Sequence, residues 1–128
     1  MDHPETVKNK SLAFAMRVVR AYRFLYEEKR EYVLSKQFLR SGTSIGANVA
    51  EAQYAFSRKD FLAKQYIALK ECAETLYWLE LLYAGSYLTD SEYASLHKDC
   101  EELRKMLSAI TKSTRDGVTP HSSLLTPN

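Results

Sequence analysis

Apolar residues recur every three or four positions along four segments of the chain, and this periodicity limits the possible folds more than any other feature. It predicts helices over residues 6–30, 35–56, 58–84 and 90–115. Because the connections between these segments are short, consecutive helices must pack as antiparallel neighbours. We therefore expect an all-α fold in which residues 1–115 form one antiparallel, up-down-up-down four-helix bundle, followed by a disordered tail over residues 116–128.

Capping signals support these boundaries. Ser35 is the expected N-cap of its helix, because its hydroxyl can accept a hydrogen bond from a first-turn amide. Ser57 and Asp60 have the spacing of a capping box at the start of the next helix. Thr89 and Glu92 have the same spacing at the start of the last one. The chain is therefore expected to restart a helix after each short connection.

The 35–56 helix carries glycine inside its helical pattern. Its expected core stripe consists of Leu34, Phe38, Ser41, Ile45, Val49, Ala52 and Phe56. Along the edge of this stripe, small residues recur every four positions at Gly42, Gly46 and Ala50. Each interior glycine costs on the order of 1 kcal/mol relative to alanine. We expect the backbone of another helix to approach closely there, and a ligand against the bare backbone is the alternative.

Two of the four helices have more apolar surface than a bundle core can cover. The 6–30 helix has a core stripe that includes Phe14 and Val18, and a second apolar line on its opposite side. The 58–84 helix is apolar around almost its whole circumference. Contiguous exposed apolar surface marks association sites, so we predict a homo-oligomer. The candidate interface residues are Leu12, Met16, Val19, Tyr26, Ile67 and Trp78.

Composition and charge limit the class of protein. The 128 residues carry 18 Lys and Arg against 16 Asp and Glu, a net charge of +2. The chain has no apolar run long enough for a membrane span and no signal-peptide pattern at its N-terminus. We therefore expect a soluble cytoplasmic protein that does not bind membranes. Cys72 and Cys100 fall on apolar positions, which favours reduced core thiols over redox or metal groups.

Two stretches of the sequence resemble a known protein family. They read FLRSGTSIGANVAEA at residues 38–52 and KDFLAKQYIALKECAETLYWLELL at residues 59–82. Both resemble the small four-helix-bundle proteins first named for open reading frames in the intervening sequences of bacterial 23S ribosomal RNA genes, and the likeness extends from Val7 to Arg115. The resemblance implies a ring-shaped homopentamer. Relatives include the accessory variability protein of diversity-generating retroelements, a basic pentamer that engages a reverse transcriptase and nucleic acid.

The resemblance also singles out a set of polar positions on the 35–56 and 58–84 helices. They are Arg40, Ser44, Asn48, Glu51, Lys64, Glu71 and Glu74. In a structural role, these side chains would tie the two helices together through charge-assisted hydrogen bonds in a largely apolar setting. In a functional role, they would line a polar binding pocket. The sequence leaves both alternatives open.

The residues that common enzyme classes need are missing from the sequence. A di-iron bundle needs Glu-x-x-His pairs, but the residue three positions before His97 is Ala94. Glu71 and Glu74 could supply only half of such a metal site. A helical ribonuclease would need an arginine shortly upstream of His97, and residues 91–96 contain none. No phosphate loop, nucleophile elbow or Cys–His pair has the required spacing. We therefore expect a non-enzymatic helical-bundle scaffold with no catalytic residue, metal or cofactor.

A basic cluster on the 6–30 helix supports an alternative function. It lies on a stretch without acidic residues and consists of Lys8, Lys10, Arg17, Arg20 and Arg23. Copies of this cluster in a ring would attract phosphates. The partner, besides other copies of the chain, would then be RNA, DNA or a nucleic-acid-handling protein, and nucleic acid would be bound without base reading and with strong salt dependence. In the alternative interpretation, these Lys and Arg residues lie at the edges of the apolar faces, and the methylene groups of their side chains cover apolar surface of the bundle.

Overall fold

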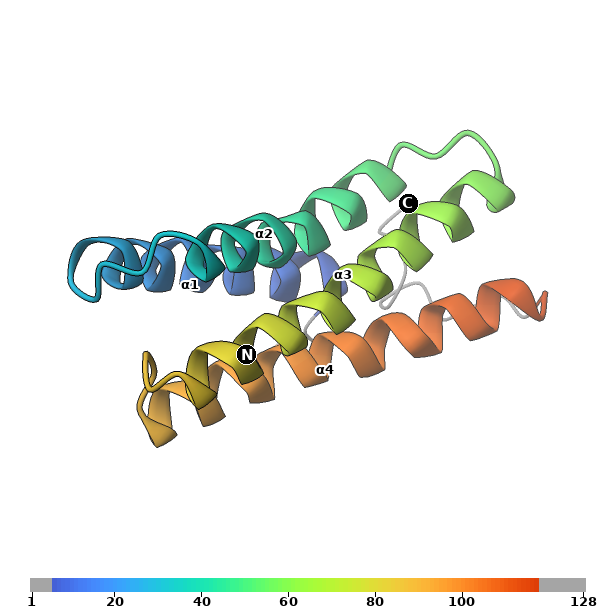
Figure 1. Cartoon of the computed structure of the whole chain (residues 1–128). Coiled ribbons are helices and arrows are strands. Elements are labelled where there is room, and N and C mark those ends of the chain that lie inside the picture. Colours follow the sequence, from blue (N-terminus) through green and yellow to red (C-terminus); the bar gives the residue numbers. More distant parts are fainter. Residues whose placement is uncertain (1–5, 118–128) are drawn as a thin grey trace, which may run out of the picture.

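The structure, a computed structural model, describes residues 6–117, which form four helices: α1 (Val7–Glu27), α2 (Leu34–Ala52), α3 (Arg58–Ala84) and α4 (Asp90–Arg115). Consecutive helices run in opposite directions and pack side by side, while α1 and α4 meet over a smaller contact (Figure 1). The predicted all-α up-down bundle is confirmed. Residues 118–128 of the expected tail lie outside the described residues. No helix within residues 6–117 combines the length and apolarity needed to cross a membrane.

The core lies between the helices and is built from the stripes that the spacing predicts. Its largest fully buried apolar side chains are Phe14, Phe38, Leu25, Ile45, Leu79, Leu82, Leu103, Leu107, Ile110, Val7 and Val18. Removing this apolar surface from water is the main driving force for folding. Gln65 is a polar exception, because it is fully buried and neither its amide nitrogen nor its amide oxygen has a hydrogen-bond partner among the described residues.

The two glycines of α2 lie where α1 comes closest. A Cβ built on Gly46 would lie 3.2 Å from the backbone oxygen of Ser11. A Cβ built on Gly42 would lie 2.8 and 2.9 Å from the two Cγ atoms of Val18. Ordinary contacts between carbon atoms are about 3.5–4.0 Å, so α1 would have to move away from α2 to accommodate a side chain at either position. The predicted close approach of another helix is confirmed.

The end of α1 differs from the expected residue 30. The helix ends at Glu27, and Arg30 then adopts the left-handed conformation with a φ of 55°. The backbone amide of Glu31 donates back to the carbonyl oxygen of Leu25 at 3.0 Å. This bond satisfies one of the free carbonyl groups at the helix end and turns the chain toward α2.

The prediction that Ser35 is the N-cap of α2 is wrong, since the helix begins at Leu34. The Glu31 carboxylate caps it instead, accepting hydrogen bonds from the backbone amides of Val33, Leu34 and Ser35 at 3.1, 3.0 and 2.5 Å. The Ser35 hydroxyl donates to the carbonyl oxygen of Glu31 at 2.6 Å. Burial raises the pKa of the Glu31 carboxyl, but these amides lower it by more, so the net pKa lies below its ordinary value.

The prediction that α2 extends to residue 56 is also wrong. The helix ends at Ala52, and the amides of residues 53–55 each donate to the carbonyl oxygen three positions back. Phe56, expected in the core stripe, is 90% exposed. The physical reason is the next helix: Ser57 caps α3 from extended backbone with a φ of −153°, so the residues before it must turn away from the axis of α2.

The starts of α3 and α4 agree with the predicted caps. The Ser57 hydroxyl accepts a hydrogen bond from the Asp60 amide at 2.9 Å, although only this half of the expected capping box is formed. At α4 both halves are present. The Glu92 amide donates to the Thr89 hydroxyl at 3.1 Å, and the Thr89 amide donates to the Glu92 carboxylate at 2.8 Å. These caps satisfy backbone amides that would otherwise be free at the helix ends.

Candidate functional site: a polar cluster and two apolar faces

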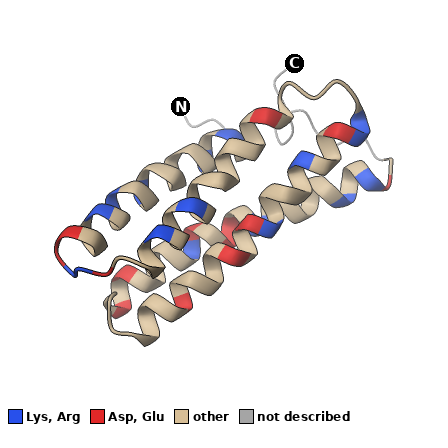
Figure 2. Ribbon diagram, turned by 45° about the horizontal axis from the view of Figure 1, so that its top comes forward, with Lys and Arg blue, Asp and Glu red and all other residues tan. Residues whose placement is uncertain are grey.

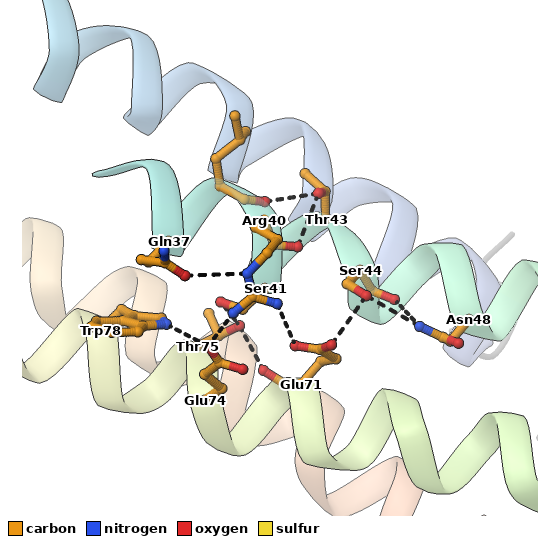
Figure 3. Close-up of polar contacts among 11 residues, drawn as sticks. Gln37, Arg40, Ser41, Thr43, Ser44, Asn48, Glu71, Glu74, Thr75 and Trp78 are labelled. Carbon is orange, nitrogen blue, oxygen red and sulfur yellow. Dashed lines mark hydrogen bonds and ion pairs between the residues drawn. The ribbon is translucent and has the colours of Figure 1, made fainter. Parts of the chain in front are cut away.

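A polar cluster joins α2 to α3 at the surface of the bundle (Figure 3). The Arg40 guanidinium forms ion pairs with Glu71, at 3.5 Å, and with Glu74. Its Nε donates a hydrogen bond to the side-chain oxygen of Gln37 at 3.2 Å. Arg40 therefore lies at the centre of the cluster and bridges two carboxylates that are one turn apart on α3.

The cluster continues along α2 and into the core. Ser44 donates to the second carboxylate oxygen of Glu71 at 3.4 Å, and the Asn48 amide donates to the carbonyl oxygen of Ser44 at 2.9 Å. Beneath these groups, the buried hydroxyls of Thr75 and Ser41 lie 2.8 Å apart. Polar contacts therefore follow the α2–α3 contact from the surface into the interior.

A separate ion pair lies further along the same two helices. Lys64 Nζ lies 2.9 Å from Glu51 Oε1, and the hydrogen bond and charge of Glu51 raise the pKa of Lys64. All the polar positions singled out in the sequence thus contact one another, either within the Arg40 cluster or in this pair. Because their charged groups are already paired, the arrangement favours the structural role over a binding pocket.

Trp78 belongs to the polar cluster, a role that its sequence position alone did not predict. Its indole N–H donates to Glu74 Oε2 at 3.0 Å, and its half-buried ring meets Tyr77 edge-on with ring centres 5.2 Å apart. Its apolar ring had made Trp78 a candidate interface residue. The four-residue spacing from Glu74 is the signal that could have identified the contact, since side chains four apart are neighbours on a helix.

The second apolar line of α1 is exposed in the single chain. Leu12 is 61% exposed, Met16 52% and Val19 42%, and we call these three residues the α1 face. Tyr26, further along the helix, is 38% exposed. Beside the α1 face lies a mostly apolar groove of about 280 Å³ between α1 and α2, lined by Lys8, Ser11, Leu12, Ala15, Thr43, Gly46, Ala47 and Ala50.

A second apolar surface lies on α3. Ile67 is 39% exposed and Tyr77 is 54% exposed, and we call these two residues the α3 face. Tyr77 was not among the candidates from the sequence, although it is more exposed than Ile67. α2 packs against both α1 and α3 (Figure 1), and the polar cluster lies along its contact with α3.

The basic residues of α1 do not form one unpaired patch. Lys10 Nζ lies 2.6 Å from a carboxylate oxygen of Glu102, and Arg17 lies 2.6 Å from Asp99, so both cations pair with α4. The hydrogen bond from Lys10 lowers the pKa of Glu102. The rest of the predicted cluster is exposed and has no ion pair within residues 6–117; these residues are Lys8, Arg20 and Arg23.

Reactive groups are few in the described part of the chain. Within residues 6–117, no group of three or more His, Cys, Asp or Glu side chains could hold a metal ion. Both thiols are free and buried, and Cys100 Sγ lies 3.6 Å from the carbonyl oxygen of Cys72. The contact with Cys72 and burial raise the pKa of the Cys100 thiol, which keeps it protonated. His97 is half-buried beside Tyr93, with ring centres 5.3 Å apart.

Comparison with known proteins identifies the family. The family model of the 23S rRNA-intervening sequence protein matches residues 5–109 of the chain. A crystal structure of a protein with unknown function, from the S23 ribosomal protein family of Bacteroides thetaiotaomicron VPI-5482, is similar with a TM-score of 0.82 and 56% sequence identity. That match covers 83% of this chain and 98% of the other. None of the curated proteins matches. The chain belongs to the family of 23S rRNA-intervening sequence proteins, as the resemblance in its second and third helices predicts.

Proposed function

We propose that the chain is a non-enzymatic scaffold that assembles with copies of itself into a ring. The observation that carries this proposal is the α1 face, where three neighbouring apolar side chains are 42–61% exposed beside an apolar groove. Exposed apolar surface of this kind is unfavourable in water, and burial against another copy removes the cost.

A ring needs two different contact surfaces on each copy. A head-to-tail contact repeats until the rotation closes, whereas a self-complementary contact stops at a dimer. The chain has two separated apolar faces, one on α1 and one on α3. In the proposed ring, the α1 face of one copy contacts the α3 face of the next. The expected number of five copies rests on the family resemblance.

Light scattering on the purified protein tests the assembly. The wild type should have a mass of several times the 14.7 kDa of one chain, and five times that mass for a pentamer. Val19→Glu, which places a charge in the α1 face, should lower the mass to that of the monomer. Val33→Glu is the matched control, because it makes the same change at a 71% exposed position outside both faces. A monomeric wild type refutes the proposal.

A mixing experiment tests the head-to-tail geometry. The Val19→Glu chain keeps an intact α3 face, and an Ile67→Glu chain keeps an intact α1 face. Each variant alone should be monomeric, because each lacks one half of the contact. Their equimolar mixture should form a dimer that cannot grow further. A mixture that stays monomeric contradicts the head-to-tail contact, and a dimer formed by either variant alone indicates a self-complementary one.

Nonspecific nucleic-acid binding by α1 is the second candidate function, and exposed Arg20 and Arg23 are the residues that favour it. Against it, Lys10 and Arg17 are neutralised by carboxylates of α4, so the charge available to phosphates is smaller than the sequence indicates. A gel-shift assay with RNA and DNA at 50 and 200 mM salt tests this function. Loss of the shift in an Arg20→Glu, Arg23→Glu double variant would support it, and no shift of the wild type at 50 mM salt rules it out.

A further inference from the structure

The end of the bundle where α2 turns into α3 exposes two aromatic rings. Phe56 is 90% exposed and Tyr54 is 88% exposed, the highest values among the exposed large apolar side chains within residues 6–117. They belong to neither apolar face and lie on the short turn between two helices. We call this turn, with the first turn of α3 and the last turn of α4, the tip.

Basic residues lie at the same end of the bundle as the two rings. Arg58 and Lys59 open α3 directly after the turn, and both are exposed. Lys112 and Arg115 lie in the last turn of α4, which ends next to the start of α3. A Cβ built on Gly117, just beyond α4, would lie 3.5 Å from a guanidinium nitrogen of Arg58. Figure 2 shows the blue residues of both helices gathered at this end of the bundle.

Acidic residues reduce the charge of the tip but do not cancel it. Asp116 pairs with Arg115 at 3.0 Å, and Asp60 lies in the first turn of α3, where a carboxylate is favoured by the helix dipole. Three cations of the tip remain without an ion pair among the described residues, namely Arg58, Lys59 and Lys112.

We infer that the tip binds single-stranded nucleic acid. Exposed aromatic rings provide flat surfaces on which unpaired bases stack, and adjacent cations contact the phosphates. Bases in a duplex are already stacked on one another, so duplexes of the same sequence should bind more weakly. The tip has no large exposed aliphatic side chain, which favours base stacking over insertion into a lipid surface. This site does not depend on the proposed ring, because its residues lie outside both apolar faces.

Fluorescence anisotropy with labelled oligo-U and oligo-dT of about 20 nucleotides tests the inference, with the matching duplexes as comparison. Both single strands should bind the wild-type chain at 50 mM salt. If three cations contact phosphates, affinity should fall roughly 20-fold between 50 and 200 mM salt. Binding of only one of the two strands would show which type of strand the tip prefers and still supports the site. No binding of either strand at 50 mM salt overturns the inference.

Substitutions at the rings and at the cations separate stacking from charge. Tyr54→Ala and Phe56→Ala should each weaken binding about five-fold or more, and both variants should fold, because the rings are exposed. Arg58→Ala with Lys59→Ala should flatten the salt dependence by roughly 1.4 in the slope of log affinity against log salt. Tyr32→Ala, at an exposed tyrosine in the α1–α2 turn at the opposite end of the bundle, is the matched control and should bind as the wild type does.

Three outcomes would assign the rings to another role and overturn the inference. The first is unchanged affinity in the Tyr54→Ala, Phe56→Ala double variant, above all if Arg20→Glu with Arg23→Glu abolishes binding. The second is a lower mass of the double variant in light scattering, which would make the tip a subunit contact. The third is co-sedimentation with anionic vesicles that the double variant loses while neither oligonucleotide binds.

Discussion

Replacing Gly42 by alanine tests whether close packing is the reason for glycine inside α2. Considered alone, alanine would stabilise the helix by about 1 kcal/mol, because glycine loses more backbone entropy on folding. In this structure the added Cβ would lie 2.8 and 2.9 Å from the Cγ atoms of Val18, well inside the ordinary contact distance of about 3.5–4.0 Å. Val18 is fully buried and its β-branched side chain is stiff, so it cannot rotate away.

The two effects have opposite signs. Overpacking of this kind costs about 1–3 kcal/mol, so Gly42→Ala should destabilise the wild-type chain by about 1 kcal/mol after the gain in helix propensity is included. Val18→Ala removes both Cγ atoms and leaves only its Cβ, 3.3 Å from the added carbon. In that background Gly42→Ala should stabilise the fold by up to about 1 kcal/mol. This reversal corresponds to a coupling energy of about 2 kcal/mol between the two positions.

Urea denaturation followed by far-UV circular dichroism measures the free energy of unfolding of the four chains. All must be compared at one protein concentration, because assembly makes the apparent stability depend on concentration. Ala109→Gly, at an exposed position of α4, is the control for propensity and should cost about 1 kcal/mol in both backgrounds. A Gly42→Ala substitution that stabilises the wild-type chain would falsify the close-packing argument.

Substitutions at three further positions test other features of the structure. Glu31→Gln should destabilise the fold by about 1 kcal/mol, because it weakens the cap of α2. The folded-state pKa of Glu31 lies below its ordinary value of 4.5. Denaturation at several pH values should therefore show the full difference in stability between the two chains above pH 4.5, and the loss of this difference as the pH falls through the folded pKa. A difference in stability that is independent of pH contradicts the role of the charge. Gln65→Met should stabilise the fold by about 1 kcal/mol in urea denaturation, because it removes a buried amide that has no hydrogen-bond partner within residues 6–117. A destabilised variant would contradict this reasoning. Glu74→Ala should change the emission of Trp78, the single tryptophan of the chain, whereas Glu74→Gln keeps an acceptor for the indole and should change it less; identical spectra for all three chains exclude the contact.

The four helices and their order could be predicted because each helix carries its own local signals. Ser57 and Thr89 cap the helices that follow them, and the apolar spacing identifies most of the buried stripe of each helix. The end of α2 could not be predicted, because the spacing continues to Phe56 although the helix stops at Ala52. Spacing alone does not distinguish a ring that packs in the core from one that lies in solvent, since tertiary contacts decide between them.

The positions of the polar site could be named from the sequence, but their partners could not. Arg40 pairs with carboxylates 31 and 34 residues away, and such a pairing depends on the rotation and register of α3 against α2. The same limit affects the basic cluster of α1. Arg17 reaches a carboxylate 82 residues away, so a count of local charges overestimates the charge that is free to attract a partner.

The position of the polar cluster also affects how copies of the chain can associate. Without charges along the α2–α3 contact, apolar side chains from α1 to α3 would form one continuous surface, which could pair with itself in several registers. Arg40 with its two carboxylates, and Lys64 with Glu51, interrupt this surface along the α2–α3 contact. A copy that slid across these ion pairs would have to remove water from them, and that desolvation is costly. In the proposed ring, these ion pairs therefore favour one register of the contact between copies over shifted ones.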